Sequence, residues 1–191
     1  GPLDMRMSPK LPVSAAQWLA EVSEVELTRC LREYGDERFA RAVARAILTV
    51  QPQSTLALAQ LVEKVVRSRS PQAARKERIH PATRTFQAIR IAVNNELGDL
   101  EKVLADSVDL LKPAGRLAVI SFHSLEDRMV KRFIRAQEKG RDLPPGVPVT
   151  DDMLGRTMKK VGKAIMPDKE ETDRNARARS AVLRIAERLD A

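Results

Sequence analysis

The stretch RLAVISFHSLEDR, from Arg116 to Arg128, decides the fold that this sequence predicts. Its apolar core, Leu117–Ile120, is not interrupted by polar residues, so we expect a β-strand that is covered on both faces. A long helical pattern and a tight turn at Pro113–Gly115 come before the strand, and another helical pattern follows it. This order of elements is typical of an α/β fold with a parallel sheet.

Two polar residues, His123 and Ser124, come directly after the predicted strand. Ligands of open α/β sheets bind outside the carboxyl ends of the strands, so these residues are candidates for an active site. Ser124 with Asp127 three residues later also forms an N-cap pattern, which we favour for this pair and which does not exclude contact with a substrate. For His123 two interpretations stay open: a structural histidine, or a group that hydrogen-bonds a bound base.

Apolar residues at helical spacing predict a series of helices, and two further apolar runs predict strands. Helices are expected over residues 15–19, with Ser14 as N-cap, and over Val25–Tyr34, Glu37–Val50, Thr55–Arg67, Thr85–Leu111 and Leu125–Gln137. Strands are expected over Lys159–Ile165 and Ala181–Glu187, with a charged, mobile excursion between them. We expect the apolar stripes of the helices to form a packed core.

Residues 67–84 differ in character from the segments on either side. They are rich in Lys and Arg, contain two prolines and show no apolar period, which indicates a basic linker between two packed units. Two interpretations stay open here as well. The segment is either a solvated loop or a strip that contacts phosphates. The residues expected to make such contacts are Arg75, Lys76, Arg78 and Arg84.

The composition favours a polyanionic partner and argues against several other classes. The 191 residues carry a net charge of +8, with 34 Lys and Arg against 26 Asp and Glu, which favours binding to nucleic acid. The single cysteine, Cys30, excludes a disulfide framework and a cysteine-based zinc site, and with two histidines no metal site is expected. No apolar run is long enough for a membrane span and no secretory signal is visible, so we expect a cytoplasmic protein.

Familiar phosphate-binding and hydrolase motifs do not occur in the sequence. It contains neither G-x-G-x-x-G nor G-x-x-x-x-G-K-[ST], and no serine in a G-x-S-x-G context. The sequence therefore predicts half of an α/β nucleotide-binding type of domain without its cofactor loop.

Six segments occur in order along nearly the whole chain and together carry a family resemblance. They are GPLDMRM at 1–7, SAAQWL at 14–19, YGDERFARAVARAI at 34–47, HPATRTFQAIRIAVNNEL at 80–97, GRLAVISFHSLEDRMVKRF at 115–133 and NARARSAVLRIAER at 175–188. The set resembles the bacterial small-subunit ribosomal RNA methyltransferase H family, also called MraW. HPATRTFQA and SFHSLEDR are its most specific parts.

The resemblance implies an enzyme that transfers a methyl group from S-adenosylmethionine to N4 of a cytosine in the decoding region of 16S rRNA, in the small ribosomal subunit. It implies a class I, Rossmann-like methyltransferase fold with a mostly helical inserted domain that helps to recognise RNA. Residues 1–82 then form most of the insert, and residues 83–191 form the C-terminal part of the methyltransferase domain. The cofactor motifs of the family match no positions here, so we expect cofactor-binding residues upstream and no activity from this chain alone.

On this resemblance, His123 and Ser124 line the pocket for the target cytosine. An alternative from another functional class is an RNA-binding module that acts through its basic surface without catalysis. Binding of S-adenosylmethionine discriminates between the two.

Overall fold

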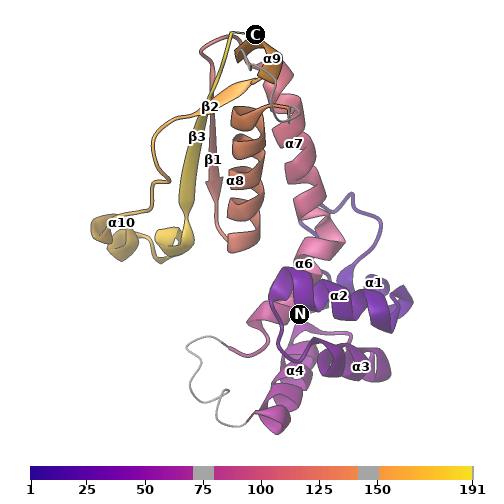
Figure 1. The fold of residues 1–191 in the computed structure, drawn as a ribbon. Coiled ribbons are helices and arrows are strands. Elements are labelled where there is room, and N and C mark those ends of the chain that lie inside the picture. The colour runs from indigo at the N-terminus through magenta and orange to yellow at the C-terminus, as the bar shows by residue number, and fades with distance from the viewer. Residues whose placement is uncertain (71–79, 142–150, 191) are drawn as a thin grey trace. The chain divides into compact units, whose positions relative to one another are not determined.

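The computed structural model describes residues 1–70, 80–141 and 151–190 (Figure 1). The chain forms two compact units, Gly1–Glu96 and Leu97–Ala191, and each has a hydrophobic core of its own. Within the described ranges, no helix is both long enough and apolar enough to cross a bilayer. The predicted division at residue 82 into an inserted and a methyltransferase domain stays a prediction.

The first unit is built from helices whose apolar stripes face one another. They are α1 (Ala15–Glu21), α2 (Glu24–Gly35), α3 (Ala40–Val50), α4 (Thr55–Arg69) and α6 (Thr83–Asn94). Ser14 caps α1 as predicted, because its hydroxyl accepts a hydrogen bond from the backbone N–H of Gln17 at 3.3 Å. Leu27, Leu31 and Ile47 are fully buried, which confirms the prediction that the stripes form a core.

The prediction of one long helix over Thr85–Leu111 is wrong, because the chain forms two helices there. Asn95 has a φ of 51° and separates α6 from α7 (Glu96–Leu110). Asparagine adopts this left-handed conformation more easily than most residues. The side chain of the preceding Asn94 donates to the carbonyl of Met5 at 2.8 Å and accepts from the N–H of Met7 at 2.7 Å. The spacing of apolar residues gives no indication of these contacts with a distant segment.

The second unit contains a three-stranded sheet, and its two longest helices lie on one side of it (Figure 1). After α7 its elements are β1 (Arg116–Ser121), α8 (Ser124–Lys139), α9 (Asp151–Leu154), β2 (Met158–Lys160), α10 (Lys169–Arg174), the 3₁₀ helix η1 (Ala176–Ser180) and β3 (Val182–Arg188). The order is β1-β3-β2, and both neighbouring pairs are antiparallel. The predicted parallel sheet is therefore wrong for the three strands that the structure describes. An apolar run indicates burial and says nothing about the direction of its partners.

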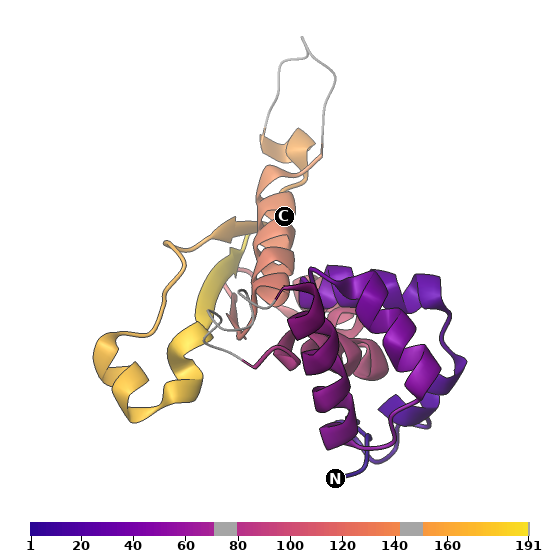
Figure 2. The ribbon, with the colours of Figure 1, turned by 90° about the horizontal axis from the view of Figure 1, so that it is seen from below.

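Strand β1 is covered on one face only, which corrects the prediction of a strand buried on both faces. Leu117 and Val119 pack against the core that α7 and α8 form with Ala186 of β3. On the other face Ala118 is exposed and Ile120 is 58% exposed. Burial alternates along β1 although polarity does not, because the outward positions are apolar too. Figure 2 shows the sheet with α8 along one side.

The charged stretch between the last two strands contains two short helices that the sequence analysis did not predict. It forms α10 and η1, which both begin at a side chain that accepts a backbone hydrogen bond. Asp168 accepts from the N–H of Glu171 at 2.7 Å, and Asn175 accepts from the N–H of Arg177 at 3.1 Å. Local capping organises these residues without an apolar face, and the mobility expected of the stretch stays a prediction.

Candidate functional site

Two buried polar atoms lie near the carboxyl end of β1 without a hydrogen-bond partner among the described residues. They are Oγ of Ser121, the last residue of the strand, and Nε2 of His123, two residues later. Buried polar side-chain atoms are almost always bonded, so an unpartnered pair at one strand end indicates a site for a ligand or water. The third such atom in the described ranges is Oγ1 of Thr28, in the first unit.

The residue that starts α8 is His123, which corrects the prediction that Ser124 caps the helix with Asp127. His123 has the extended backbone of an N-cap, and its Nδ1 accepts from the N–H of Glu126 at 3.4 Å. The carboxylate of Glu126 accepts in return from the N–H of His123 at 3.2 Å and from that of Phe122 at 2.8 Å. Ser124 is the first helical residue and is exposed.

Sequence reasoning missed Glu126, although a signal for it was present. In His123-Ser124-Leu125-Glu126 the glutamate stands three residues after the cap, which is the spacing of a capping box. Serine is the usual capping residue and histidine is not, so the pattern was assigned one residue too late. Asp127 has a different role, because it pairs with Arg184 of β3.

The capping geometry determines how His123 presents its ring. Since Nδ1 accepts a hydrogen bond, the proton of the neutral imidazole is on Nε2. Nε2 lies 3.3 Å from Oε1 of Glu126, in a geometry that makes no hydrogen bond. The side chain of His123 is 13% exposed. The start of α8 thus holds the ring, and the buried Nε2–H lies beside the carboxylate of Glu126.

The environment of Glu126 favours its ionised form. Burial by itself raises the pKa of this carboxyl. Its interactions with the His123 side chain and with the backbone N–H groups of Phe122 and His123 lower the pKa by more than burial raises it. The net pKa is below the ordinary value of 4.5. A charged acceptor therefore stays next to His123 at neutral pH.

Acid should weaken the second unit through this group. Because the folded-state pKa of Glu126 is lowered, its stabilising contribution is complete above the ordinary value and is lost as the pH falls through the lower folded value. We expect Glu126→Gln to reduce the free energy of unfolding by about 1 kcal/mol at pH 7. Chemical denaturation from pH 7 to pH 3 checks this. The difference in the free energy of unfolding between wild type and variant should become smaller as the pH falls. A constant difference would contradict the stabilising role of ionised Glu126.

All four predicted phosphate contacts stay predictions. Arg75, Lys76 and Arg78 lie outside the described residues. Arg84 is half-buried in the first turn of α6, and its backbone carbonyl faces Gly35 of α2.

The sequence is similar to that of known proteins over nearly its whole length. The sequence model of the MraW methylase family matches residues 1–189. The chain is 53% identical over 193 residues to the ribosomal RNA small subunit methyltransferase H of Hydrogenovibrio crunogenus, with 99% of the chain and 60% of that relative covered. The proteins of the same name from Thioalkalivibrio sulfidiphilus and Shewanella baltica are 53% and 50% identical over 190 and 197 residues. These alignments cover 99% and 100% of the chain and 60% and 61% of the relatives, so the chain spans about 60% of their length.

Proposed function

The chain belongs to the MraW methylase family, and from this premise we propose that it takes part in methylating N4 of a cytosine in the decoding region of 16S rRNA. The methyl donor in this proposal is S-adenosylmethionine, and the partner is the small ribosomal subunit. The names of the relatives, all ribosomal RNA small subunit methyltransferase H, support the reaction type and the RNA.

The observation that carries the proposal is the unpartnered pair at the end of β1. The edge of a cytosine offers one donor, the N4 amine, and two acceptors, N3 and O2. Nε2–H of His123 suits an acceptor of the base, and the hydroxyl of Ser121 suits either kind of atom. The exposed hydroxyl of Ser124, one residue after His123, is a further contact for the same base.

Positioning is the main task of such a site. The lone pair of the N4 amine is delocalised into the ring, so the base must be taken out of its stack and held in line with the methyl group. Fixing two reactants in this way lowers a barrier by about 7–11 kcal/mol. His123 contributes by fixing the orientation of the base, since the start of α8 holds its ring in place.

The described residues do not by themselves fit the methyl donor. Among them, the turn from β1 to α8 has the sequence Phe122-His123 and contains no glycine that would let the backbone approach a nucleoside closely. S-adenosylmethionine supplies the methyl group, and we derive no step through it. For the same reason we expect calorimetry to detect no binding of S-adenosylmethionine to the 191-residue chain.

The histidine can be tested apart from its capping role. We expect His123→Asn in the complete gene product to lower methyl transfer to small ribosomal subunits about tenfold, the equivalent of one lost hydrogen bond. Asparagine is a good N-cap, so thermal stability should stay near that of wild type. Incorporation of a tritiated methyl group measures the rate, and Ser180→Ala is the control. Undiminished transfer with unchanged RNA affinity would remove His123 from the pocket.

The alternative of an RNA-binding module without catalysis is favoured by the net charge of +8. The complete gene product discriminates between the two functions. Binding of S-adenosylmethionine and transfer of its methyl group support the enzyme, whereas RNA binding without either supports the module.

A further inference from the structure

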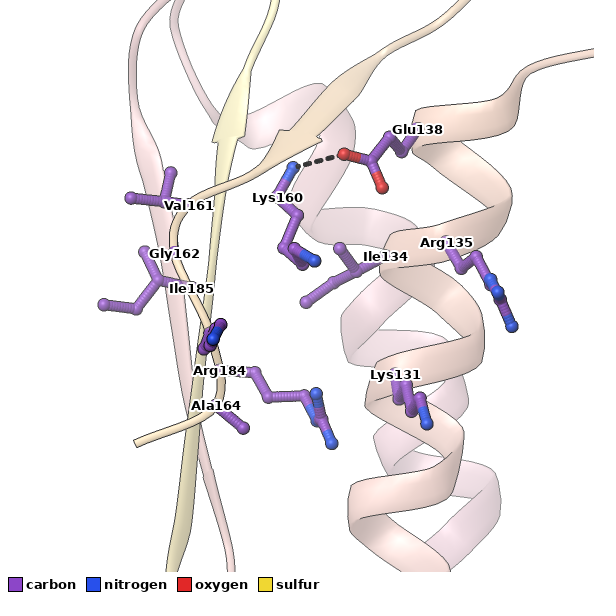
Figure 3. Close-up of a pocket in the computed structure, with 11 residues that line it drawn as sticks. Lys131, Ile134, Arg135, Glu138, Lys160, Val161, Gly162, Ala164, Arg184 and Ile185 are labelled. Carbon is purple, nitrogen blue, oxygen red and sulfur yellow. Dashed lines mark hydrogen bonds between the residues drawn. The ribbon is translucent and has the colours of Figure 1, made fainter. Parts of the chain in front are cut away.

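A cavity of about 150 Å³ lies between α8 and the strands β2 and β3 of the second unit (Figure 3). Five cationic side chains line it, and we call it the basic groove. They are Lys131 and Arg135 of α8, Lys160 at the end of β2, Lys163 just after it, and Arg184 of β3. Figure 3 shows Lys160 and Arg184 reaching from the strands toward α8.

Most of the positive charge of the basic groove is not neutralised by the protein. Lys131, Arg135, Lys160 and Lys163 are exposed and form no ion pair with any residue that the structure describes. Arg184 is the exception, since it pairs with Asp127 outside the lining.

One carboxylate, that of Glu138, lines the basic groove. It accepts a hydrogen bond from the backbone N–H of Lys160 at 3.3 Å and so ties α8 to β2. A single negative charge cannot balance this many cations within a small volume. Their mutual repulsion raises the free energy of the empty groove, and a bound anion would relieve it.

Apolar side chains also line the basic groove. Ile134 is 3% exposed and lies between Lys131 and Arg135 on the same face of α8. A lining of cationic and apolar side chains suits a phosphate joined to a sugar better than it suits a small inorganic anion, because the sugar can cover the apolar surface.

We propose that the basic groove binds the phosphodiester backbone of the RNA substrate, with a phosphate held between Lys131 of α8 and Lys160 of β2. This inference rests on the proposed function, which supplies the RNA, and it adds a positioning surface apart from the unpartnered atoms at the end of β1. Contacts with phosphates fix the register of a bound RNA and carry no sequence information.

The test compares pairs of lysines in the 191-residue chain. We expect the Lys131→Gln, Lys160→Gln double variant to bind a fluorescent decoding-region hairpin about tenfold more weakly in low salt. The slope of log affinity against log salt concentration should fall by about 1 to 2, in line with one or two lost phosphate contacts. The matched control is Lys112→Gln with Lys169→Gln, two exposed lysines of the same unit that do not line the groove.

Glu138→Gln gives a test of opposite sign. The amide oxygen of glutamine can still accept from Lys160, while the negative charge in the basic groove is lost. We expect this variant to bind the hairpin about two- to fivefold more tightly. If the groove had a purely structural role, this variant would not gain affinity for the hairpin.

Each outcome supports or overturns the inference. Equal effects of the groove pair and the control pair would overturn it, as would a wild-type chain that binds no RNA. A scrambled RNA of equal length separates the groove from the proposed function. If the groove variant, and not the control variant, binds both RNAs more weakly while the complete gene product methylates neither RNA, the inference about the groove is supported and the proposed function is overturned.

Discussion

Replacing Gly35 with alanine should destabilise the first unit by about 3 kcal/mol, which is more than any surface change in this chain should cost. A methyl group at Gly35 would lie 2.6 Å from the carbonyl oxygen of Arg84 and 3.2 Å from Cβ of Ala88. The first of these atoms belongs to the backbone of α6 and cannot rotate away. The two helices would have to separate, and the core between them, which includes Leu31 and Ile89, would loosen.

The sign of this prediction depends on which of two effects is larger. Alanine inside a helix is favoured over glycine by about 0.5–1 kcal/mol, so Gly→Ala at an open position would stabilise α2. At Gly35 the steric conflict outweighs that gain, because a contact of 2.6 Å with a fixed carbonyl is far inside van der Waals distance.

Trp18 provides the measurement, since it is the single tryptophan of the chain and packs against the core of the first unit. Its fluorescence during chemical denaturation should show an earlier transition for Gly35→Ala. Glu33→Ala, at an exposed position of the same helix, should leave the transition nearly unchanged. An unaltered or later transition for Gly35→Ala would show that α2 and α6 are not in close contact.

Asp127→Ala should destabilise the second unit by about 2–3 kcal/mol. The two oxygens of Asp127 lie 2.7 and 3.0 Å from Nε and a terminal nitrogen of Arg184, a two-pronged pair that joins α8 to β3. The side chains are 23% and 17% exposed, so solvent screens the pair only partly. The hydrogen bonds that Arg184 donates to Asp127 raise the pKa of Arg184. A guanidinium also keeps its charge when the aspartate is removed. The cost comes from leaving that charge largely buried and unpaired.

A double variant distinguishes the loss of the ion pair from the cost of leaving the charge of Arg184 without a partner. Asp127→Ala with Arg184→Leu should recover part of the loss, because it removes the unpaired cation together with its partner. Far-UV circular dichroism reports on both units, and the fluorescence of Trp18 reports on the first. A transition that appears in the dichroism and not in the fluorescence therefore belongs to the second unit, which has no tryptophan or tyrosine. Asp106→Ala, at an exposed position of α7, is the control. A loss for Asp127→Ala no greater than that of the control would show that the ion pair does not hold α8 on the sheet.

Much of the local structure follows from sequence patterns because it depends on neighbours along the chain. The helices α2, α3, α4 and α8, and the strands β1 and β3, lie within a few residues of their predicted bounds. In each case the apolar spacing and a stop or cap signal agree. The break at Asn95 was not predictable in this way, since contacts of Asn94 with Met5 and Met7 stabilise it from a distant segment.

The candidate site was only partly predictable for a similar reason. Sequence reasoning placed His123 at the end of a strand, and the structure adds that its Nε2 has no hydrogen-bond partner in the described ranges. Ser121 was missed because the sequence does not show that the serine at the end of the strand is buried and that its hydroxyl has no hydrogen-bond partner in the described ranges. The basic groove was missed because Lys131 and Lys160 are far apart in the sequence, and only their shared cavity makes them one site.

The sequence by itself determined the composition of the two cores, the position of β1 before α8, and the family to which the chain belongs. Each of these depends on residue types at short spacing. The tertiary structure decided the antiparallel order β1-β3-β2, the exposed outer face of β1, and the choice of His123 as the helix cap. The direction of a strand's partner and the partner of a polar atom depend on segments that meet only after folding, when burial makes an unsatisfied group costly.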